Sequence, residues 1–407
     1  MTDEQKDGPL SGYRVLEIGH YIAAPFCARL LADLGADIVK IEPPAGDPVR
    51  LWGKHVNGVA PWWSQHARNK RSLSLNLKHP DAMEIVKSLV RSCDAVVENF
   101  RPGQLEKWGL GDEILREAKP DIVIAHISGF GQDGPHRDRA AFGVIAEAVG
   151  GMRYLTNHRP GQTDLPPVRV GVSIGDSVAG LYAALGIVAA LLKNRSPAKQ
   201  AERGETIDVA LADSVLSLME GLVPDYGTFG EIRQPVGAGI TTAAPSGAYP
   251  TKDGAWILVA ANSDPLFIRL AGLMGSQLDG DPRFRDNRCR VSHADELDGL
   301  ISNWTRSRTL AELEQALIEA DIPCARVSTA QDVVDNVQFR FRNMIQPIPD
   351  PLIGEVFHTG IVPRFQKNPG RIRWTGPSVG QHTDAILEDF LGYDECKRQS
   401  LRSDGVI

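Results

Sequence analysis

The aspartate at position 176 is the residue of this sequence whose setting best suits covalent chemistry. It follows the β-branched run Val168-Arg-Val-Gly-Val-Ser-Ile174 and Gly175, and it precedes the apolar segment 177–192. This pattern predicts a strand, a tight turn and a buried helix, with one carboxylate at the helix start. The carboxylate then has two interpretations: an N-cap that accepts a backbone N–H, or a nucleophile whose charge the helix dipole stabilises.

Length and composition limit the classes of protein to consider. The chain has 407 residues, of which 42% are hydrophobic, with 40 Gly and 27 Pro. This is typical of a loop-rich globular enzyme with two domains, or with one domain and a large insertion. The net charge of −7 argues against nucleic acid or an anionic membrane as the main partner. An anionic small ligand would need a local basic pocket.

The cysteines and the apolar segments indicate the compartment. The five cysteines are far apart and show no metal-ligand spacing, so we expect reduced thiols, no metal site and a cytoplasmic protein. The stretch 1–9 is polar and has no apolar signal core. The uncharged run 177–192 falls short of the roughly 20 residues that span a bilayer, which predicts a core helix and no membrane partner.

The first half of the chain alternates short apolar runs with helical patterns. Strands of this kind, separated by helices of ten or so residues, predict an α/β fold with a Rossmann-like, open and largely parallel sheet. Ligands of such sheets lie beyond the carboxyl ends of the strands. The predicted strands are 13–19, 36–42, 72–77, 95–99, 121–127 and 206–210, and the predicted helices among them include 25–34 and 80–92.

The amino-acid composition of the sequence changes after about residue 224. Residues 225–247 are rich in Gly, Pro and Thr, and 246–261 predicts a hairpin with Lys252-Asp-Gly254 as its turn. Helical patterns follow at 264–275, 294–306 and 309–320, and a last helix is predicted at 383–391. We therefore expect a large domain at 1–223, a smaller α+β domain at 224–330 and a return to the large domain at 331–407.

The segment Val15-Leu-Glu-Ile-Gly19 resembles the opening of a dinucleotide or S-adenosylmethionine site. Glu42 ends the next strand, where a ribose-binding acid would stand. The glycine pattern then fails: Gly19-His-Tyr-Ile-Ala-Ala-Pro25 has no second or third glycine to admit a pyrophosphate. The Walker A and H-E-x-x-H motifs are also absent from the sequence.

Six motifs occur in a fixed order along the chain. They are Leu31-Ala-Asp-Leu-Gly-Ala-Asp-Ile-Val-Lys-Ile-Glu42, Asn69-Lys-Arg-Ser-Leu-Ser-Leu-Asn76, Val97-Glu-Asn-Phe-Arg-Pro-Gly103, Gly129-Phe-Gly-Gln-Asp-Gly-Pro135, Gly175-Asp176 and Gly380-Gln-His382. In this order they resemble one family, the family III CoA-transferases, which includes formyl-CoA transferase, a carnitine CoA-transferase and α-methylacyl-CoA racemase. The resemblance extends from about residue 10 to 395.

The resemblance implies a transferase that moves CoA from an acyl-CoA donor to a free carboxylic acid. The residue at the position of Asp176 is the family's nucleophile, which passes through a mixed anhydride and an aspartyl-CoA thioester. No permanently bound cofactor is implied, since coenzyme A enters as a substrate. The residues that fall where the family lines its CoA cleft are His20, Tyr21, Ile22, Ala23, Leu75, Lys78, Asn99, Phe100, Arg101 and Lys107.

The sequence departs from the family where an acidic or amide helper often follows an aromatic residue. That position is Gly143 here, so a helper carboxylate is missing or comes from elsewhere. Arg137 and Arg139 precede it and are candidates to pair with the carboxylate of an acid substrate. The racemase branch has a histidine base in the same segment, and none stands in 139–144. A diluted glycine run at 235–245 is a candidate mobile lid.

Two alternatives to the transferase stay open at this stage. One is an α-methylacyl-CoA racemase or epimerase on the same fold, and the other is a non-catalytic CoA-binding protein. The family also forms an interlocked homodimer, which the predicted linkers near 224–245 and 326–350 would permit. The expected partners are therefore an acyl-CoA, a small carboxylic acid and a second copy of the chain.

Overall fold

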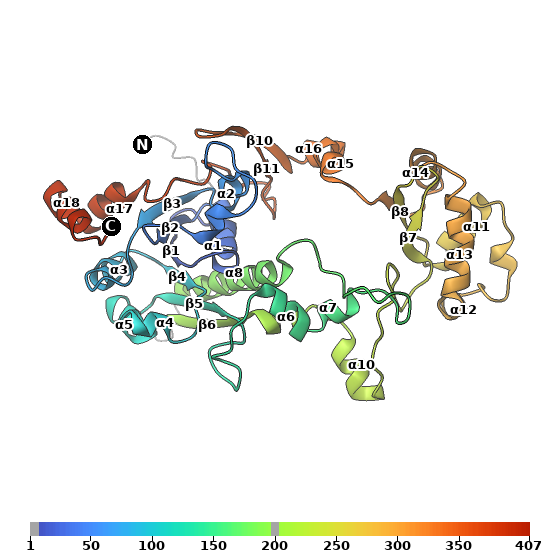
Figure 1. Cartoon of the computed structure of the whole chain (residues 1–407), viewed down its shortest axis with the longest axis horizontal. Coiled ribbons are helices and arrows are strands. Elements are labelled where there is room, and N and C mark those ends of the chain that lie inside the picture. Colours follow the sequence, from blue (N-terminus) through green and yellow to red (C-terminus); the bar gives the residue numbers. More distant parts are fainter. Residues whose placement is uncertain (1–7, 197–202) are drawn as a thin grey trace. The chain divides into compact units, whose positions relative to one another are not determined.

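The computed structural model describes residues 8–196 and 203–407 (Figure 1). Most of the polar N-terminal stretch noted above, residues 1–7, lies outside the described part. The chain divides into two compact units. Unit 1 comprises residues up to 152, 170–224 and 340–407, and unit 2 comprises 153–169 and 225–339. The division expected from the sequence assigned 153–169 to the large domain, whereas in the structure this segment belongs to unit 2.

Unit 1 is built on a six-stranded sheet in the order β3-β2-β1-β4-β5-β6, in which every neighbouring pair is parallel. The prediction of an open parallel sheet is confirmed. The strand order reverses between β1 and β4, and in such sheets ligands bind beside this switch point. The strands are β1 Arg14–Ile18, β2 Asp37–Glu42, β3 Lys70–Ser74, β4 Ala95–Glu98, β5 Val123–Ser128 and β6 Glu205–Ala210.

Helices cover both faces of this sheet, as a doubly wound fold requires. One core joins alternate residues of β1, β4 and β5 to α1 and α8, and the other joins the opposite residues to α3, α5 and α17. The helices in these layers are α1 Ala23–Asp33, α8 Ile174–Arg195, α3 Ala82–Val90, α5 Asp112–Ala118 and α17 Thr383–Leu391. Small residues let α1 and α8 approach closely: a Cβ on Gly180 would lie 2.6 Å from the Ala23 carbonyl oxygen.

The other elements of unit 1 lie around these layers. An antiparallel ribbon, β10 with β11, follows the return of the chain from unit 2. It was not predicted, because its alternation is interrupted by prolines at 347 and 349. These elements are α2 Pro61–His66, α4 Gln104–Lys107, α6 Gly143–Val149, α9 Leu211–Leu216, β10 Ile345–Asp350, β11 Gly354–Thr359, α18 Glu395–Ser403 and the 3₁₀ turn Pro48–Leu51.

Unit 2 has a three-stranded antiparallel sheet in the order β7-β8-β9, with helices packed on one face. The predicted hairpin at 246–261 and the three predicted helices are confirmed within a few residues. Residues 230–245, which contain the candidate lid, have no regular secondary structure. The elements are α7 Met152–Leu155, α10 Leu222–Phe229, β7 Ser246–Pro250, β8 Trp256–Ala260, α11 Asp264–Leu273, α12 Asn287–Ser292, α13 Ala294–Thr305, α14 Leu310–Glu319, β9 Cys324–Arg326, α15 Ala330–Asp335 and α16 Val337–Phe341. Of these, α7, α10 and α16 span a boundary between the two units.

The segment before Asp176 is not the strand that the sequence predicted. Residues 166–173 have no regular structure, and Val168 and Val172 are exposed. The β-branched run has no partner strand, and strand propensity without a ladder does not make a strand.

Helix α8 is also longer than expected. It has 22 residues and is long and apolar enough to cross a bilayer, so the argument from a 16-residue run was wrong. Its packing identifies it as a core helix, because Ala183, Ile187 and Leu191 are buried against the sheet.

Candidate active site

The turn after β1 stands at the switch point and is held in a conformation that costs free energy. Tyr21 has a φ of +63°, in the left-handed region that residues other than glycine rarely adopt. The backbone of His20 is bonded twice to Asn99 after β4: its N–H donates to Asn99 Oδ1 (2.9 Å), and its carbonyl accepts from Nδ2 (2.8 Å). These bonds join the two turns that border the switch point.

A buried ionic cluster lies behind this turn. The ammonium of Lys40 contacts Glu17 at 2.7 Å, Asp47 at 2.8 Å and the Gly19 carbonyl at 2.8 Å, and Lys70 contacts Glu17 at 2.8 Å. Burial opposes the charge of Lys40, but the carboxylates of Asp47 and Glu17 outweigh it and raise its pKa. Asp47 in turn accepts from Tyr21 N (3.1 Å), so the cluster holds the left-handed residue in place.

His66 holds the same turn from the other side. Its Nε2 lies 2.9 Å from the Tyr21 carbonyl oxygen, which only accepts, so this nitrogen carries the proton. Burial and the charge of Lys70 lower the pKa of His66 to about 3. A neutral imidazole therefore donates to Tyr21 at ordinary pH.

The turn after β4 is also held by buried ionisable side chains. His126, a buried residue of β5, lies 2.6 Å from Glu98 and 2.9 Å from Asp112. Burial opposes its charge, but hydrogen bonds to Asp112 and Glu98 outweigh this effect and raise the pKa of His126 to about 10. Glu98 also accepts from Phe100 N at 2.7 Å. An imidazolium therefore fixes the carboxylate that orients Phe100.

Asp176 lies in the first turn of α8, as its third residue. The N-cap is Ser173, so the interpretation of Asp176 as the cap is wrong. The partial positive charge of the helix N-terminus still falls on the Asp176 carboxylate. Residue 143 stands directly against it: an ideal Cβ on Gly143 would lie 2.7 Å from Asp176 Cγ and 3.0 Å from Asp176 N. In this geometry any side chain at the helper position would force the Asp176 carboxylate or α8 to shift.

A pocket of about 230 Å³ contains Asp176 and most of the residues named from the sequence. We call it the Asp176 pocket. It brings together residues from the turns after β1 and β4, the loop 137–142 and the start of α8. The predicted site residues that line it are His20, Tyr21, Ala23, Asn99, Phe100, Arg101, Arg137, Arg139 and Asp176. The lining residues that were not among the predicted site residues are Pro102, Ile127, Ser128, Gly129, Ala140, Ala141, Phe142 and Leu211.

A second pocket, of about 220 Å³, shares His20 and Phe100 with the first. We call it the Leu75 pocket. Its walls are mainly apolar, from Ile18, Ile41, Pro43, Leu75 and Trp108, and the exposed Lys78 lies at its edge. The ring of Phe100 meets His20 at 5.1 Å and Trp108 at 4.9 Å, both edge to face. An apolar recess with one cation suits the planar end of a charged ligand.

Two of the predicted residues line neither of these pockets. Ile22 is buried in a small apolar cluster with Val49 and Trp63, and Lys107 is exposed at the end of α4. Glu42, considered above for a ribose, is fully buried and bonded twice to Arg50 at 2.7 Å. Its carboxylate is already occupied, which agrees with the failed nucleotide motif.

The buried ions escaped the sequence analysis, although a signal for them was present. Glu17 and Lys40 are charged residues inside apolar strands, and they face each other in the β1–β2 register. A charge within a buried parallel strand requires a partner, so the pair could have been predicted once the strand order was assumed.

Comparison with known proteins identifies a family that has this fold. The sequence model of CoA-transferase family III matches residues 10–383. The succinyl-CoA–D-citramalate CoA-transferase of Chloroflexus aurantiacus is 43% identical over 410 residues, covering 100% of both chains. The succinyl-CoA–L-malate CoA-transferase beta subunit of the same organism is 37% identical over 98% of each chain. A CAIB/BAIF family protein from Brucella suis has a TM-score of 0.83 at 30% identity, covering 94% of this chain and 100% of its own.

The chain therefore belongs to CoA-transferase family III. It is an acyl-CoA:carboxylate CoA-transferase, with CoA thioesters and carboxylic acids as its substrates.

Proposed function

We propose that this enzyme transfers CoA from succinyl-CoA to a hydroxydicarboxylic acid of the citramalate type, with Asp176 as the nucleophile. The observation that carries the proposal is the Asp176 pocket itself. Asp176 is the sole acidic residue among its lining residues, whereas Arg101, Arg137 and Arg139 all line it. A dicarboxylate reacts through one carboxylate and keeps the other charged, which a guanidinium binds in a bidentate manner. Full-length similarity to a succinyl-CoA–D-citramalate transferase supports this choice.

In the first half-reaction an Asp176 oxygen attacks the thioester carbonyl carbon of the donor. The carbon–sulfur bond breaks, CoA leaves as a thiolate, and a mixed anhydride joins the acyl group to Asp176. The thiolate then attacks the γ-carbonyl carbon of Asp176, the donor acid leaves as a carboxylate, and an aspartyl-CoA thioester remains. No proton is consumed, which suits a carboxylate nucleophile with no helper side chain at position 143.

In the second half-reaction the incoming acid repeats the exchange. Its carboxylate attacks the aspartyl thioester carbon and displaces CoA thiolate, and the thiolate attacks the acceptor's carbonyl carbon in the new anhydride. The acceptor leaves as its CoA thioester and Asp176 is regenerated. Each intermediate is an activated acyl group, so water must be excluded from the pocket.

The two pockets suggest how CoA binds. We place the acyl thioester in the Asp176 pocket and the adenine end of CoA in the Leu75 pocket, with Lys78 toward its phosphates. His20 and Phe100 line both pockets and therefore stand along the pantetheine chain. Ile22 and Lys107 line neither of these two pockets. In this proposal Ile22 supports the turn from within its apolar cluster, and Lys107 contributes only a distant positive charge.

We also infer a cytoplasmic homodimer. The five cysteines are free thiols, in keeping with a reducing compartment. The outer face of α8 exposes an apolar stripe at helical spacing, Leu181, Leu185 and Leu192, exposed by 56%, 63% and 65%. A stripe of this kind is typical of a surface that another chain covers. The net charge of −7 gives no support to nucleic acid or an anionic membrane as partner.

Trapping the intermediate tests the mechanism. After incubation with succinyl-CoA and borohydride or hydroxylamine, mass spectrometry is expected to find the modification on the peptide containing Asp176. Asp176→Asn keeps the shape and removes the nucleophile, so transfer activity should fall by at least about 10³-fold with no adduct. Asp213→Asn is the matched control: Asp213 is an exposed first-turn aspartate of α9 outside the pocket. An adduct that persists in Asp176→Asn would disprove the assignment.

The substrates need a separate test. We expect labelled CoA to pass from succinyl-CoA to citramalate or malate faster than to carnitine, mesaconate, oxalate or formate. Exchange of the α-hydrogen of a branched acyl-CoA without movement of CoA would instead identify a racemase. His136, the histidine nearest the racemase position, lies 5.7 Å from the Phe130 ring and is not among the residues that line the pocket.

A further inference from the structure

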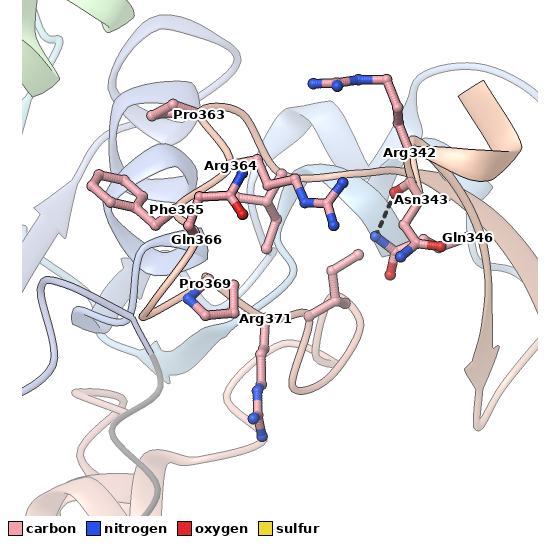
Figure 2. Close-up of a pocket in the computed structure, with 12 residues that line it drawn as sticks. Arg342, Asn343, Gln346, Pro363, Arg364, Phe365, Gln366, Pro369 and Arg371 are labelled. Atoms are coloured by element: carbon pink, nitrogen blue, oxygen red, sulfur yellow. Dashed lines mark hydrogen bonds between the residues drawn. The ribbon is translucent and has the colours of Figure 1, made fainter. Parts of the chain in front are cut away.

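A third pocket in unit 1 is formed by residues far from Asp176 in the sequence, and basic and amide side chains line it. It encloses about 430 Å³ between residues 342–346 and 361–372. Arg342, Arg364 and Arg371 line it together with Gln346 and Gln366, and no acidic residue does. We call it the arginine pocket. Figure 2 shows Arg364 extending across it toward Asn343 and Gln346, with Arg342 and Arg371 on opposite sides.

Two of these arginines carry uncompensated charge. Within the described part of the chain, the guanidinium groups of Arg342 and Arg364 make no ion pair and no hydrogen bond, and both residues are exposed. Other arginines of unit 1 have carboxylate partners: Arg68 contacts Asp33 at 2.7 Å, and Arg50 contacts Glu42 at 2.7 Å. In a protein of net charge −7, two exposed guanidinium groups that line one pocket without a carboxylate form a local site for an anion.

The arginine pocket is separate from the Asp176 pocket. Its wall at 370–373 is fixed beside the start of β3: Asn69 Nδ2 donates to the Arg371 carbonyl (2.8 Å), and Arg373 N donates to Asn69 Oδ1 (2.6 Å). Asn69 directly precedes β3, so this wall lies at the amino edge of the sheet. The Asp176 pocket lies at the opposite, carboxyl edge, and the two pockets share no lining residue.

The remaining walls narrow the class of ligand. Ile361, Pro363, Phe365 and Pro369 give the pocket an apolar side, which an inorganic ion would not need. The guanidinium groups are spread along the pocket in Figure 2, which fits several anionic groups on one molecule better than a single ion. Guanidinium groups bind phosphate oxygens in a bidentate manner and stack on planar rings.

We propose that the arginine pocket is a second ligand site of this enzyme, which binds a small molecule with two or more phosphate groups and a planar or apolar portion, of the nucleotide diphosphate class. The site does not require the proposed substrate of the Asp176 pocket. Binding there would leave the nucleophile and its pocket unoccupied and would coexist with bound CoA.

Calorimetric titration of enzyme preloaded with about one equivalent of CoA per chain tests the proposal, because this amount occupies the catalytic site and leaves no excess CoA to compete with ADP. The probes are ADP, pyrophosphate and citrate. We expect ADP to bind with a stoichiometry of one per chain, pyrophosphate to bind more weakly, and citrate to bind weakest. The double variant Arg342→Gln/Arg364→Gln should weaken ADP binding by about 100-fold, roughly tenfold for each charge-assisted contact removed. Transfer activity without ADP should be unchanged, since neither residue lines the Asp176 pocket.

Lys367→Gln is the matched control. Lys367 is an exposed cation of the same segment that does not line the pocket, and its loss changes net charge by one unit. ADP binding should change less than about twofold in this variant, and circular dichroism should show all variants folded. Absence of ADP binding to the CoA-preloaded enzyme would overturn the proposal. Equal ADP affinity in the double variant, or binding of citrate in preference to both phosphate probes, would overturn it as well.

Discussion

One wall of the Asp176 pocket consists of the turns after β1 and β4, and the other consists of the loop 137–142 with the start of α8. The first wall stands on buried ions. Lys40, Glu17 and Asp47 lie behind one turn, and His126 and Glu98 lie behind the other. The second wall is mainly a surface loop and exposes Arg139 and Phe142.

We infer that the two walls have different roles in substrate binding. Buried ion pairs hold the left-handed Tyr21 and the Asn99 bridge in one geometry, which suits a wall that binds the constant part of every substrate, CoA. The loop wall presents guanidinium groups whose positions a few substitutions can change, which suits recognition of a variable acid. Binding residues on loops over a rigid scaffold are a common arrangement.

The largest effect on stability is expected from Lys40→Met, which breaks the first wall. Asp47 would keep its bonds from Tyr21 N and Val49 N but lose its cation, leaving a buried carboxylate uncompensated. Removing one partner of a buried pair costs about 3–5 kcal/mol of unfolding free energy. Urea denaturation measures this loss, and the KM for succinyl-CoA should rise as the turn loosens.

Two variants sharpen that result. Lys40→Met combined with Asp47→Asn should recover part of the lost stability, because the orphaned charge is removed with its partner. Arg91→Met removes an exposed ion pair with Glu84 at 3.6 Å and should leave the denaturation midpoint unchanged. Equal losses for Lys40→Met and Arg91→Met would show that the buried cluster does not support the wall.

The next largest effect is expected from Gly143→Ala in the second wall. The added methyl group would meet the Asp176 carboxylate, so the carboxylate or α8 must shift. A displacement of about 1 Å at a reacting group can cost about 10²-fold in kcat, and we expect a loss of this size with thermal stability nearly preserved. Gly299→Ala is the control, since nothing lies within 4 Å of a Cβ at that helical position. An unchanged kcat in Gly143→Ala would contradict the close approach of residue 143 to the nucleophile.

The pH dependence of stability tests the buried His126–Glu98 ion pair behind the turn after β4. The folded state raises the pKa of His126 from 6.5 to about 10, so it binds a proton that the unfolded chain releases. The stabilisation is therefore complete below pH 6.5 and is lost as the pH rises toward 10, with a slope of at most about 1.4 kcal/mol per pH unit. The free energy of unfolding, measured from pH 6.5 to 8.5, should fall in the parent protein.

The comparison variant for this slope is His126→Gln, which keeps hydrogen-bonding capacity and cannot titrate. Its stability should be lower at pH 6.5 and nearly flat up to pH 8.5. The buried thiols of Cys27 and Cys93 have raised pKa values and affect only the more alkaline range. A parallel slope in the two proteins would show that His126 is not charged in the fold.

The smallest effect is expected from removing one guanidinium of the loop wall. Arg139→Gln should raise the KM for the acceptor acid by about tenfold, the value of one charge-assisted contact, and leave the KM for succinyl-CoA within about twofold. A monocarboxylate acceptor should lose less than a dicarboxylate, because only the second carboxylate needs the guanidinium. Steady-state kinetics with both acceptor types checks this, and equal losses would remove Arg139 from acid recognition.

The sequence by itself determined the alternation of strands and helices, the six strands of the sheet and the place of Asp176 at the start of a helix. These features depend on local periodicity and on residue types near one another in the chain. It also placed Gly19-His20-Tyr21 and Asn99-Phe100-Arg101 at strand ends, where the pocket was found.

Only the tertiary structure decided which of these residues meet. Strand order brings β1 beside β4, and so joins His20 to Asn99 across 79 positions of sequence. The irregular segment 166–173 formed no strand, because no neighbouring strand offered it hydrogen bonds. The tight contact of Gly143 with Asp176, and the open guanidinium groups of Arg342 and Arg364, likewise depend on packing between distant segments. No local pattern encodes these distances, since they follow from where the layers place the backbone.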